Sequence, residues 1–98
     1  MSRYVLDTSA YAHFKRGDAE VVDLIDSAEW VGVPSVVLGE LWTGFLLGRR
    51  ARENDAELRQ FMSNPAVAEI TTDAAVARVY AEIIVSLRRK GTPLPVND

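Results

Sequence analysis

The amino-acid sequence predicts an α/β protein in which parallel strands alternate with helices. Three short apolar runs, rich in β-branched and aromatic residues, predict strands at Tyr4–Leu6, Trp30–Val33 and Val67–Ile70. Longer segments with apolar residues at helical spacing separate these runs. Strands joined by helical connections favour a parallel sheet with right-handed crossovers. The 98 residues are 48% hydrophobic, which is typical of one small globular domain.

Polar residues mark the expected starts of the first two helices. The group Asp7-Thr8-Ser9 follows the first strand and caps helices well, so a helix should open at about Ser9. Asp18 is the expected cap of a second helix, whose apolar residues are Val21, Val22, Leu24 and Ile25.

Three further helices are expected after the second strand. Ser35 is the predicted cap of the first, which carries Leu38, Leu41, Trp42 and Phe45 at helical spacing. The next helix precedes Asn64-Pro65 and carries Leu58, Phe61 and Met62. The last helix follows the capping group Thr71-Thr72-Asp73, and Gly91 and Pro93 should end it.

Composition excludes several classes of protein. The formal net charge is −3, so any binding to nucleic acid must come from local basic patches. The chain has no cysteine, which rules out disulfides and thiolate metal sites. Its N-terminal stretch lacks the long apolar run of a signal peptide or a membrane span. We therefore expect a cytoplasmic protein.

The order of the expected strands places the first one on an edge of the sheet. Three strands wound in one direction leave Tyr4–Leu6 with an unpaired ladder, although this segment is apolar on both faces, as suits a central strand. Ligands of such sheets bind beyond the carboxyl ends of the strands, where the winding direction reverses. A reversal here requires at least one more strand beside Tyr4–Leu6.

Three acids are candidates for chemistry at that end of the sheet: Asp7, Glu40 and Asp98. Converging carboxylates repel one another unless a cation neutralises them. Oxygen ligands without cysteine or clustered histidine suit Mg²⁺ or Mn²⁺, the ions of metal-dependent nucleases. Taken alone, each acid also has a structural interpretation: Asp7 as a helix cap, Glu40 as a solvated helix residue and Asp98 as an unstructured terminus.

Three segments together resemble the PIN-domain ribonucleases, and most closely the VapC-type toxins of toxin–antitoxin modules. They are VLDTSAY, PSVVLGELWTG and GTPLPVND, in the order of the family. The resemblance implies a three-layer PIN-like fold and an Mg²⁺-dependent endoribonuclease whose metal-binding catalytic acids are Asp7, Glu40 and Asp98. In the family a helix and two strands follow the third acid. The resemblance therefore implies that residues 1–98 are one PIN-like domain that is incomplete at its C-terminus and has only the first three strands and their helices.

The resemblance also implies partners, namely a cognate antitoxin, an RNA substrate and a second copy in a homodimer. The residues expected at these contacts are the hydroxyl residues Thr8 and Ser9, the aromatic residues Trp42 and Phe45, and the basic residues Arg49, Arg50 and Arg52. The aromatic pair, with Leu46, could equally belong to the core, and the arginines could contact RNA phosphates or an acidic partner segment. The alternative to an enzyme is a catalytically inactive fragment that acts only as a protein-binding surface.

Overall fold

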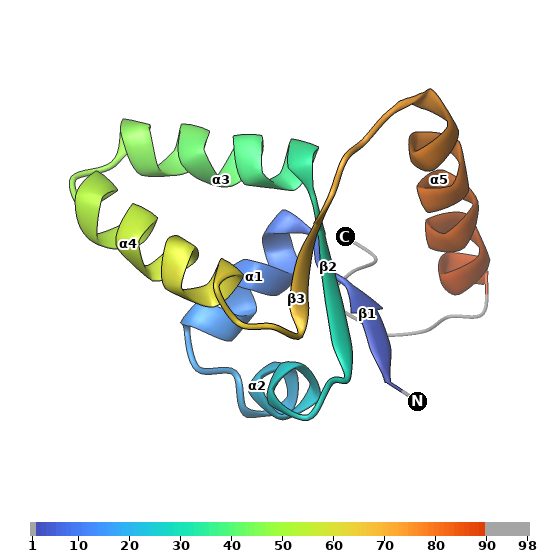
Figure 1. The fold of residues 1–98 in the computed structure, drawn as a ribbon, viewed down its shortest axis with the longest axis horizontal. Helices are drawn as coiled ribbons and strands as arrows, with labels where there is room; N and C mark the ends of the chain where they lie inside the picture. The colour runs from blue at the N-terminus through green and yellow to red at the C-terminus, as the bar shows by residue number, and fades with distance from the viewer. Residues whose placement is uncertain (1, 90–98) are drawn as a thin grey trace.

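The computed structural model describes residues 2–89, which form three strands and five helices (Figure 1). The strands are β1 (Arg3–Val5), β2 (Trp30–Pro34) and β3 (Val67–Ile70). The helices are α1 (Thr8–Lys15), α2 (Ala19–Asp26), α3 (Ser35–Leu47), α4 (Ala51–Met62) and α5 (Ala74–Arg89). The α/β architecture is the one predicted from the sequence, with each strand within one residue of its expected bounds.

The sheet is parallel and has the strand order β1-β2-β3. Val31 in the central strand lies between Tyr4 of β1 and Val67 of β3, and Gly32 lies between Val5 and Ala68. Within the described chain β1 is an edge strand, as the sequence predicted. Its pairing with β2 extends one residue past the strand, because the N–H of Leu6 donates to the carbonyl oxygen of Gly32 at 2.9 Å.

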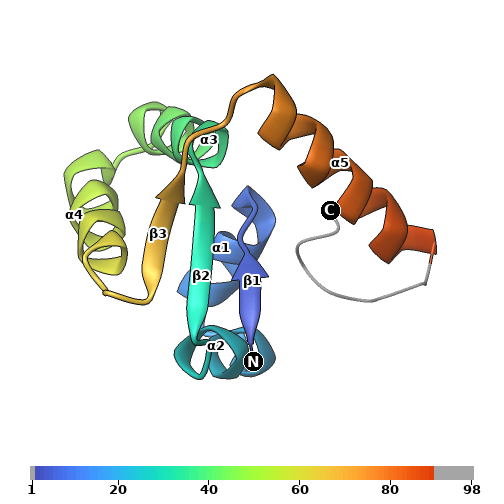
Figure 2. The same ribbon diagram turned by 45° about the vertical axis from the view of Figure 1, so that its right-hand side comes forward.

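Helices lie on both faces of the sheet, but unevenly (Figures 1 and 2). Helices α1, α3 and α4 cover one face, α2 lies beside α1 at the end of the sheet where the strands begin, and α5 lies on the other face. Because successive strand residues point to opposite faces, Val31 and Val33 point together with Leu6 and Val67 into the layer under α1, α3 and α4. The buried core consists of these residues and of helix residues packed on them: Ala10, Tyr11, Val37, Leu38, Leu41 and Leu58.

The opposite face of the sheet is apolar and only partly covered. Gly32 lies on this face beside the indole ring of Trp30 and the end of the Ile70 side chain. Val5 and Pro34 lie on the same face and line a cavity below α5 together with Ile70. This face therefore contributes the floor of a cavity, whereas the other face contributes the core.

Three helices begin directly after an aspartate that caps them. The sequence predicted Asp18 as one of these caps and placed Asp7 and Asp73 within the capping groups of the other two helices. The side chains of Asp7, Asp18 and Asp73 each accept a hydrogen bond from the backbone N–H three residues ahead. For α1 the cap is Asp7, so the helix begins at Thr8, one residue before the expected start. No described helix is long and apolar enough to cross a membrane.

The expected cap at Ser35 is wrong. Pro34 precedes the first turn of α3 without a side-chain hydrogen bond, and Ser35 is already helical. The Ser35 hydroxyl instead accepts from the backbone N–H of Thr72 at 3.2 Å and donates to the Thr72 hydroxyl at 3.3 Å. The residue thus ties the start of α3 to the segment that leads into α5.

Gly32 provides a test of the packing between β2 and its neighbours. A Cβ atom there would overlap the Trp30 ring and the end of Ile70. We expect Gly32→Ala to lower the free energy of unfolding by about 1–3 kcal/mol, measured by urea denaturation. The control is Gly39→Ala, because Gly39 is helical and a Cβ there meets no atom. That change should stabilise the protein by about 0.5–1 kcal/mol. Equal effects of the two variants would contradict the packing described.

Tyr11 is buried, and its hydroxyl has no hydrogen-bond partner among the described residues. Its ring packs against Phe14 and Phe61, with centroid distances of 6.3 and 5.5 Å. Burial, assisted by the negative charge of Glu57, raises the pKa of Tyr11 to about 12. The hydroxyl is therefore a group that the folded protein keeps neutral and leaves unsatisfied.

At pH 7 the free energy of unfolding of Tyr11→Phe should equal that of the wild type or exceed it by up to about 1 kcal/mol. The reason is that the substitution removes no hydrogen bond. The unfolded chain releases the tyrosine proton near the ordinary pKa of 10, and the folded protein does so only near 12. Wild-type stability should therefore fall between these pH values more steeply than that of the variant. Urea denaturation at pH 8 and pH 11 measures the difference. Marked destabilisation of the variant at pH 7 would reveal a hidden partner for the hydroxyl.

Candidate active site

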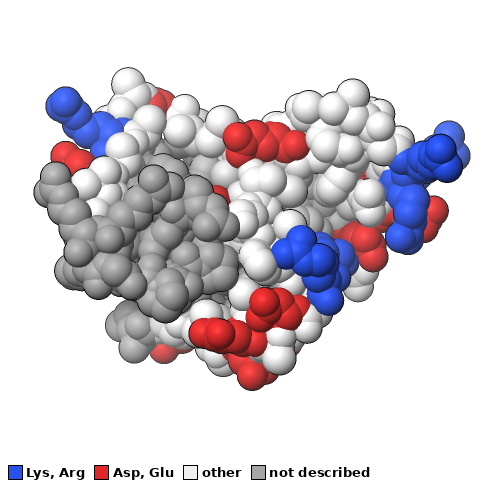
Figure 3. Space-filling view, turned by 180° about the vertical axis from the view of Figure 1, so that it is seen from behind, with Lys and Arg blue, Asp and Glu red and all other residues white. Residues whose placement is uncertain are grey.

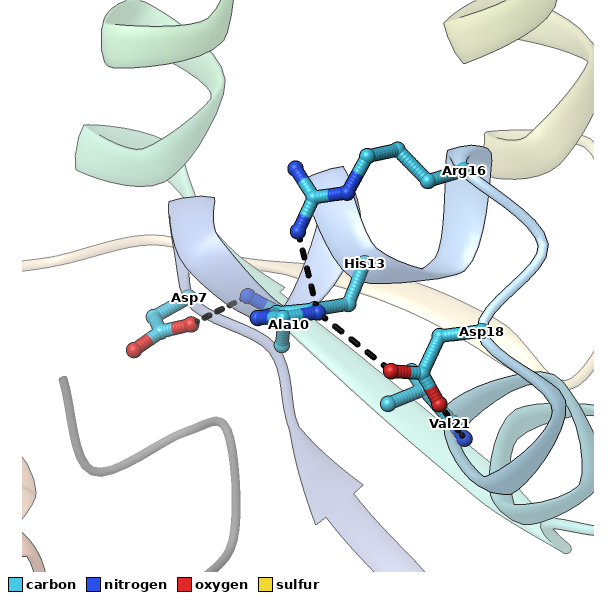
Figure 4. Close-up of polar contacts among 6 residues, drawn as sticks. All are labelled: Asp7, Ala10, His13, Arg16, Asp18 and Val21. Carbon is cyan, nitrogen blue, oxygen red and sulfur yellow. Dashed lines mark hydrogen bonds and ion pairs between the residues drawn. The ribbon is translucent and has the colours of Figure 1, made fainter.

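Asp7 lies where β1 ends and α1 begins, and its carboxyl group is held in place. The residue is extended and only 8% exposed. Its Oδ1 atom accepts a hydrogen bond from the backbone N–H of Ala10 at 2.7 Å (Figure 4). A carboxylate in this position also benefits from the positive end of the helix dipole. The structural interpretation as a helix cap therefore holds, and it fixes the acid at the carboxyl end of a strand.

Glu40 reaches the same region from another element. It lies in the second turn of α3, which follows β2, and it is exposed to solvent. Because β1 and β2 are parallel, the helices that follow them begin at the same edge of the sheet. The hydroxyl of Thr8, the first residue of α1, donates a hydrogen bond to Oε1 of Glu40 at 2.6 Å. This bond joins the start of α1 to the second turn of α3.

Both acids line one cavity of about 720 Å³ between the sheet and α5. Its polar lining includes Asp7, Thr8, Ser9 and Glu40 at the strand ends. The rest is mostly apolar and comes from the sheet and from α3 and α5, with Val5, Pro34, Val36, Ile70, Val76 and Val79. The carboxylates therefore sit beside an apolar wall, where water screens charges less than it does on an open surface.

The side-chain atoms that could bind a metal ion here are all oxygen atoms. Two carboxylates and the hydroxyls of Thr8 and Ser9 line the cavity. Oxygen ligands of this kind suit Mg²⁺ or Mn²⁺, and Mg²⁺ is commonly held by only one or two carboxylates. Within residues 2–89 no group of three or more acidic, histidine or cysteine side chains could hold a metal. The third expected acid, Asp98, lies outside the described residues.

His13 lies near the other end of α1, among different partners (Figure 4). Its Nδ1 atom is 3.0 Å from Nη2 of Arg16 and 3.5 Å from a carboxylate oxygen of Asp18. These contacts join the end of α1 to the start of α2. The residue does not line the cavity, so it contributes no acid or base to the site.

A second surface of interest is the α3–α4 hairpin. Leu46 and Leu47 at the end of α3 are 78% and 84% exposed, and Trp42 is 44% exposed. The Trp42 indole N–H donates to a carboxylate oxygen of Asp55 in α4 at 3.1 Å. Phe45 differs from its neighbours, because it is half-buried and packs against the core. Of the two aromatic residues, Trp42 is therefore at the surface and Phe45 contributes to the core.

Basic side chains follow this apolar surface in the turn between the two helices and at the start of α4. Lys and Arg side chains gather at the right-hand edge of Figure 3, where the α3–α4 hairpin ends. Arg50 is bound to Glu53 by two hydrogen bonds, so its charge is locally neutralised. Arg49 and Arg52 are exposed and make no ion pair with another described residue. The hairpin thus combines exposed leucines with uncompensated positive charge.

The Thr8–Glu40 hydrogen bond was not predicted from the sequence. The two residues are 32 positions apart, and neither is an unusual residue type at its position in the helix. The only available signal was the position of Thr8 directly after Asp7 at the end of a strand. Because parallel strands end at the same edge of the sheet, Thr8 could have been predicted to lie near α3. Glu40 could not have been predicted as its hydrogen-bond partner.

Comparison with known proteins supports the fold. The PIN domain family matches residues 4–98 of the chain. A chain of VapBC2 from Rickettsia felis, solved with a DNA fragment from its promoter, aligns with a TM-score of 0.66 and 21% identity, over 94% of this chain and 71% of that one. A chain of DNA-bound VapBC from Salmonella typhimurium aligns with a TM-score of 0.60 and 26% identity, over 96% and 71%. Among curated proteins none matches the sequence.

Proposed function

Because this chain belongs to the PIN domain family, we propose that it is the nuclease toxin of a toxin–antitoxin module and that it hydrolyses RNA with the help of Mg²⁺. The observation that carries the proposal is the meeting of Asp7 and Glu40 in one cavity at the carboxyl end of the sheet. This is the place where open α/β sheets bind their ligands. The structural likeness to chains of VapBC complexes supports the toxin–antitoxin assignment.

The residues that would hold the metal are Asp7 and Glu40, with Asp98 as the proposed third ligand. A bound Mg²⁺, or Mn²⁺ in its place, would polarise a phosphoryl oxygen and lower the pKa of a water molecule for attack on phosphorus. Asp7 would contribute a carboxylate whose direction is set by its bond to the Ala10 N–H. Glu40 would contribute a second one from α3, and the N-terminal end of α1 would favour a phosphate group nearby.

The proposed antitoxin binds elsewhere on the molecule. We assign antitoxin binding to the α3–α4 hairpin, because Trp42, Leu46 and Leu47 are exposed there and exposed apolar patches mark interfaces. The free charges of Arg49 and Arg52 favour a partner segment that also carries carboxylates. They would equally attract the phosphates of an RNA substrate. The functional protein in this proposal is a homodimer.

Metal-dependent RNA cleavage tests the enzyme assignment. With Mg²⁺, the protein should cleave RNA, and Asp7→Asn and Glu40→Gln should each lower the rate by more than about 100-fold. The reason is that losing an outer-shell partner of a metal already costs 10–100-fold. Asn caps helices about as well as Asp, so the melting temperature of Asp7→Asn should stay close to that of the wild type. Cleavage is measured on labelled RNA, with chelator as a further control.

Two outcomes would contradict the assignment. Magnesium-dependent cleavage that persists in both variants would place the active site elsewhere. A folded protein that binds its antitoxin but cleaves no RNA would favour the alternative function, a protein-binding surface without catalysis.

Substitutions on the hairpin test the partner assignment. The double variant Leu46→Ser/Leu47→Ser should weaken binding of the antitoxin by at least about tenfold, because it removes exposed apolar area from the interface. Val85→Ser is the matched control, since Val85 is an exposed apolar residue on α5. Binding is measured by calorimetry and the oligomeric state by light scattering. Unchanged antitoxin affinity with loss of the dimer would assign the leucines to the dimer interface instead.

A further inference from the structure

The Glu40 carboxylate depends on a single neighbour in the described part of the chain. Its Oε1 atom accepts a hydrogen bond from the Thr8 hydroxyl at 2.6 Å, and no other described side chain binds it. A distance of this length is typical of a hydroxyl that donates to an ionised carboxylate, which is among the stronger hydrogen bonds of proteins. Without it, Glu40 would be an exposed side chain on a helix surface with several rotamers open to it.

Thr8 is itself held firmly, so it can act as an anchor. It is the first residue of α1, and the preceding residue, Asp7, caps that helix through the Ala10 N–H. The side chain of Thr8 is half-buried and β-branched, which restricts its rotation about χ1. Its hydroxyl therefore points toward α3 from a backbone position that is fixed by the same acid that lines the cavity.

We propose that Thr8 is the residue that positions Glu40 for metal binding, a role that rests on the function proposed above. The bond occupies Oε1 and leaves Oε2 of Glu40 open to a cation shared with Asp7. Because Thr8 orders the side chain before the metal arrives, less ordering remains to be done on binding. Thr8 thus acts through Glu40, in the way that outer-shell partners orient the ligands of metal sites.

The test is Mn²⁺ binding to the complete protein without RNA, measured by calorimetry and by electron paramagnetic resonance. Thr8→Val removes the hydroxyl and keeps the shape, and it should weaken Mn²⁺ binding about 10–100-fold. Thr8→Ser should restore most of the affinity, because it returns the donor. Thr43→Val is the matched control: the Thr43 hydroxyl donates to the carbonyl oxygen of Gly39 on the same helix, and its loss should leave the affinity unchanged.

A second readout separates positioning from folding. Raising the Mn²⁺ concentration should recover RNA cleavage by Thr8→Val, whereas Glu40→Gln should stay inactive at every concentration. Thr8→Ala provides a second variant without the hydroxyl in case Thr8→Val folds poorly, and thermal melting of each variant reports on the fold.

The outcomes distinguish this inference from the proposed function. Wild-type Mn²⁺ affinity in a folded Thr8→Val or Thr8→Ala, with weakened binding by Glu40→Gln, would overturn the role of Thr8 and leave the metal site intact. Equally weak binding by Thr8→Ser and Thr8→Val would also overturn it, because the effect would then not follow the hydroxyl. Unchanged affinity in both Asp7→Asn and Glu40→Gln would overturn the metal site itself.

Discussion

The fold and the site both depend on how Asp7 ends β1 and starts α1. Its carboxylate accepts the Ala10 N–H, so only two residues, Leu6 and Asp7, separate the end of β1 from the start of α1. This abrupt junction places Thr8 at the first helical position, within reach of Glu40 on α3. One local hydrogen bond, made in the first ten residues, therefore holds the start of α1 where its first residue contacts α3 beside the cavity.

Much of the fold follows from local patterns in the sequence. The strands were predictable because the apolar runs are short and rich in β-branched and aromatic residues, which favours a strand over a buried helix segment. Asp18 was predictable as a cap because its bond spans only three residues. Ser35 was not, because Thr72 competes for its hydroxyl from 37 positions away. A cap can be read from neighbouring residues, whereas a tertiary hydrogen bond depends on the path of the whole chain.

The candidate site was predictable in its location and less so in its contacts. Parallel topology alone brings the residues after β1 and β2 to one edge, so the meeting of Asp7 and Glu40 in one cavity follows from the strand pattern. The hairpin shows the limit of such reasoning. Helical spacing puts Trp42 and Phe45 on one stripe, yet Phe45 packs on the core and Trp42 is exposed. The difference arises from packing against residues distant in the sequence, which no local pattern encodes.

The two tryptophans differ in their surroundings, and this gives the protein its own optical probes. Trp30 is half-buried, and its ring lies over Gly32 on the sheet. Trp42 lies at the surface, and its indole N–H donates a hydrogen bond to Asp55. A small quencher in solution should therefore reach Trp42 more readily than Trp30, and the exposure of Trp30 should increase when the sheet opens. Emission from one ring thus reports on what approaches the hairpin, and emission from the other on whether the fold is intact.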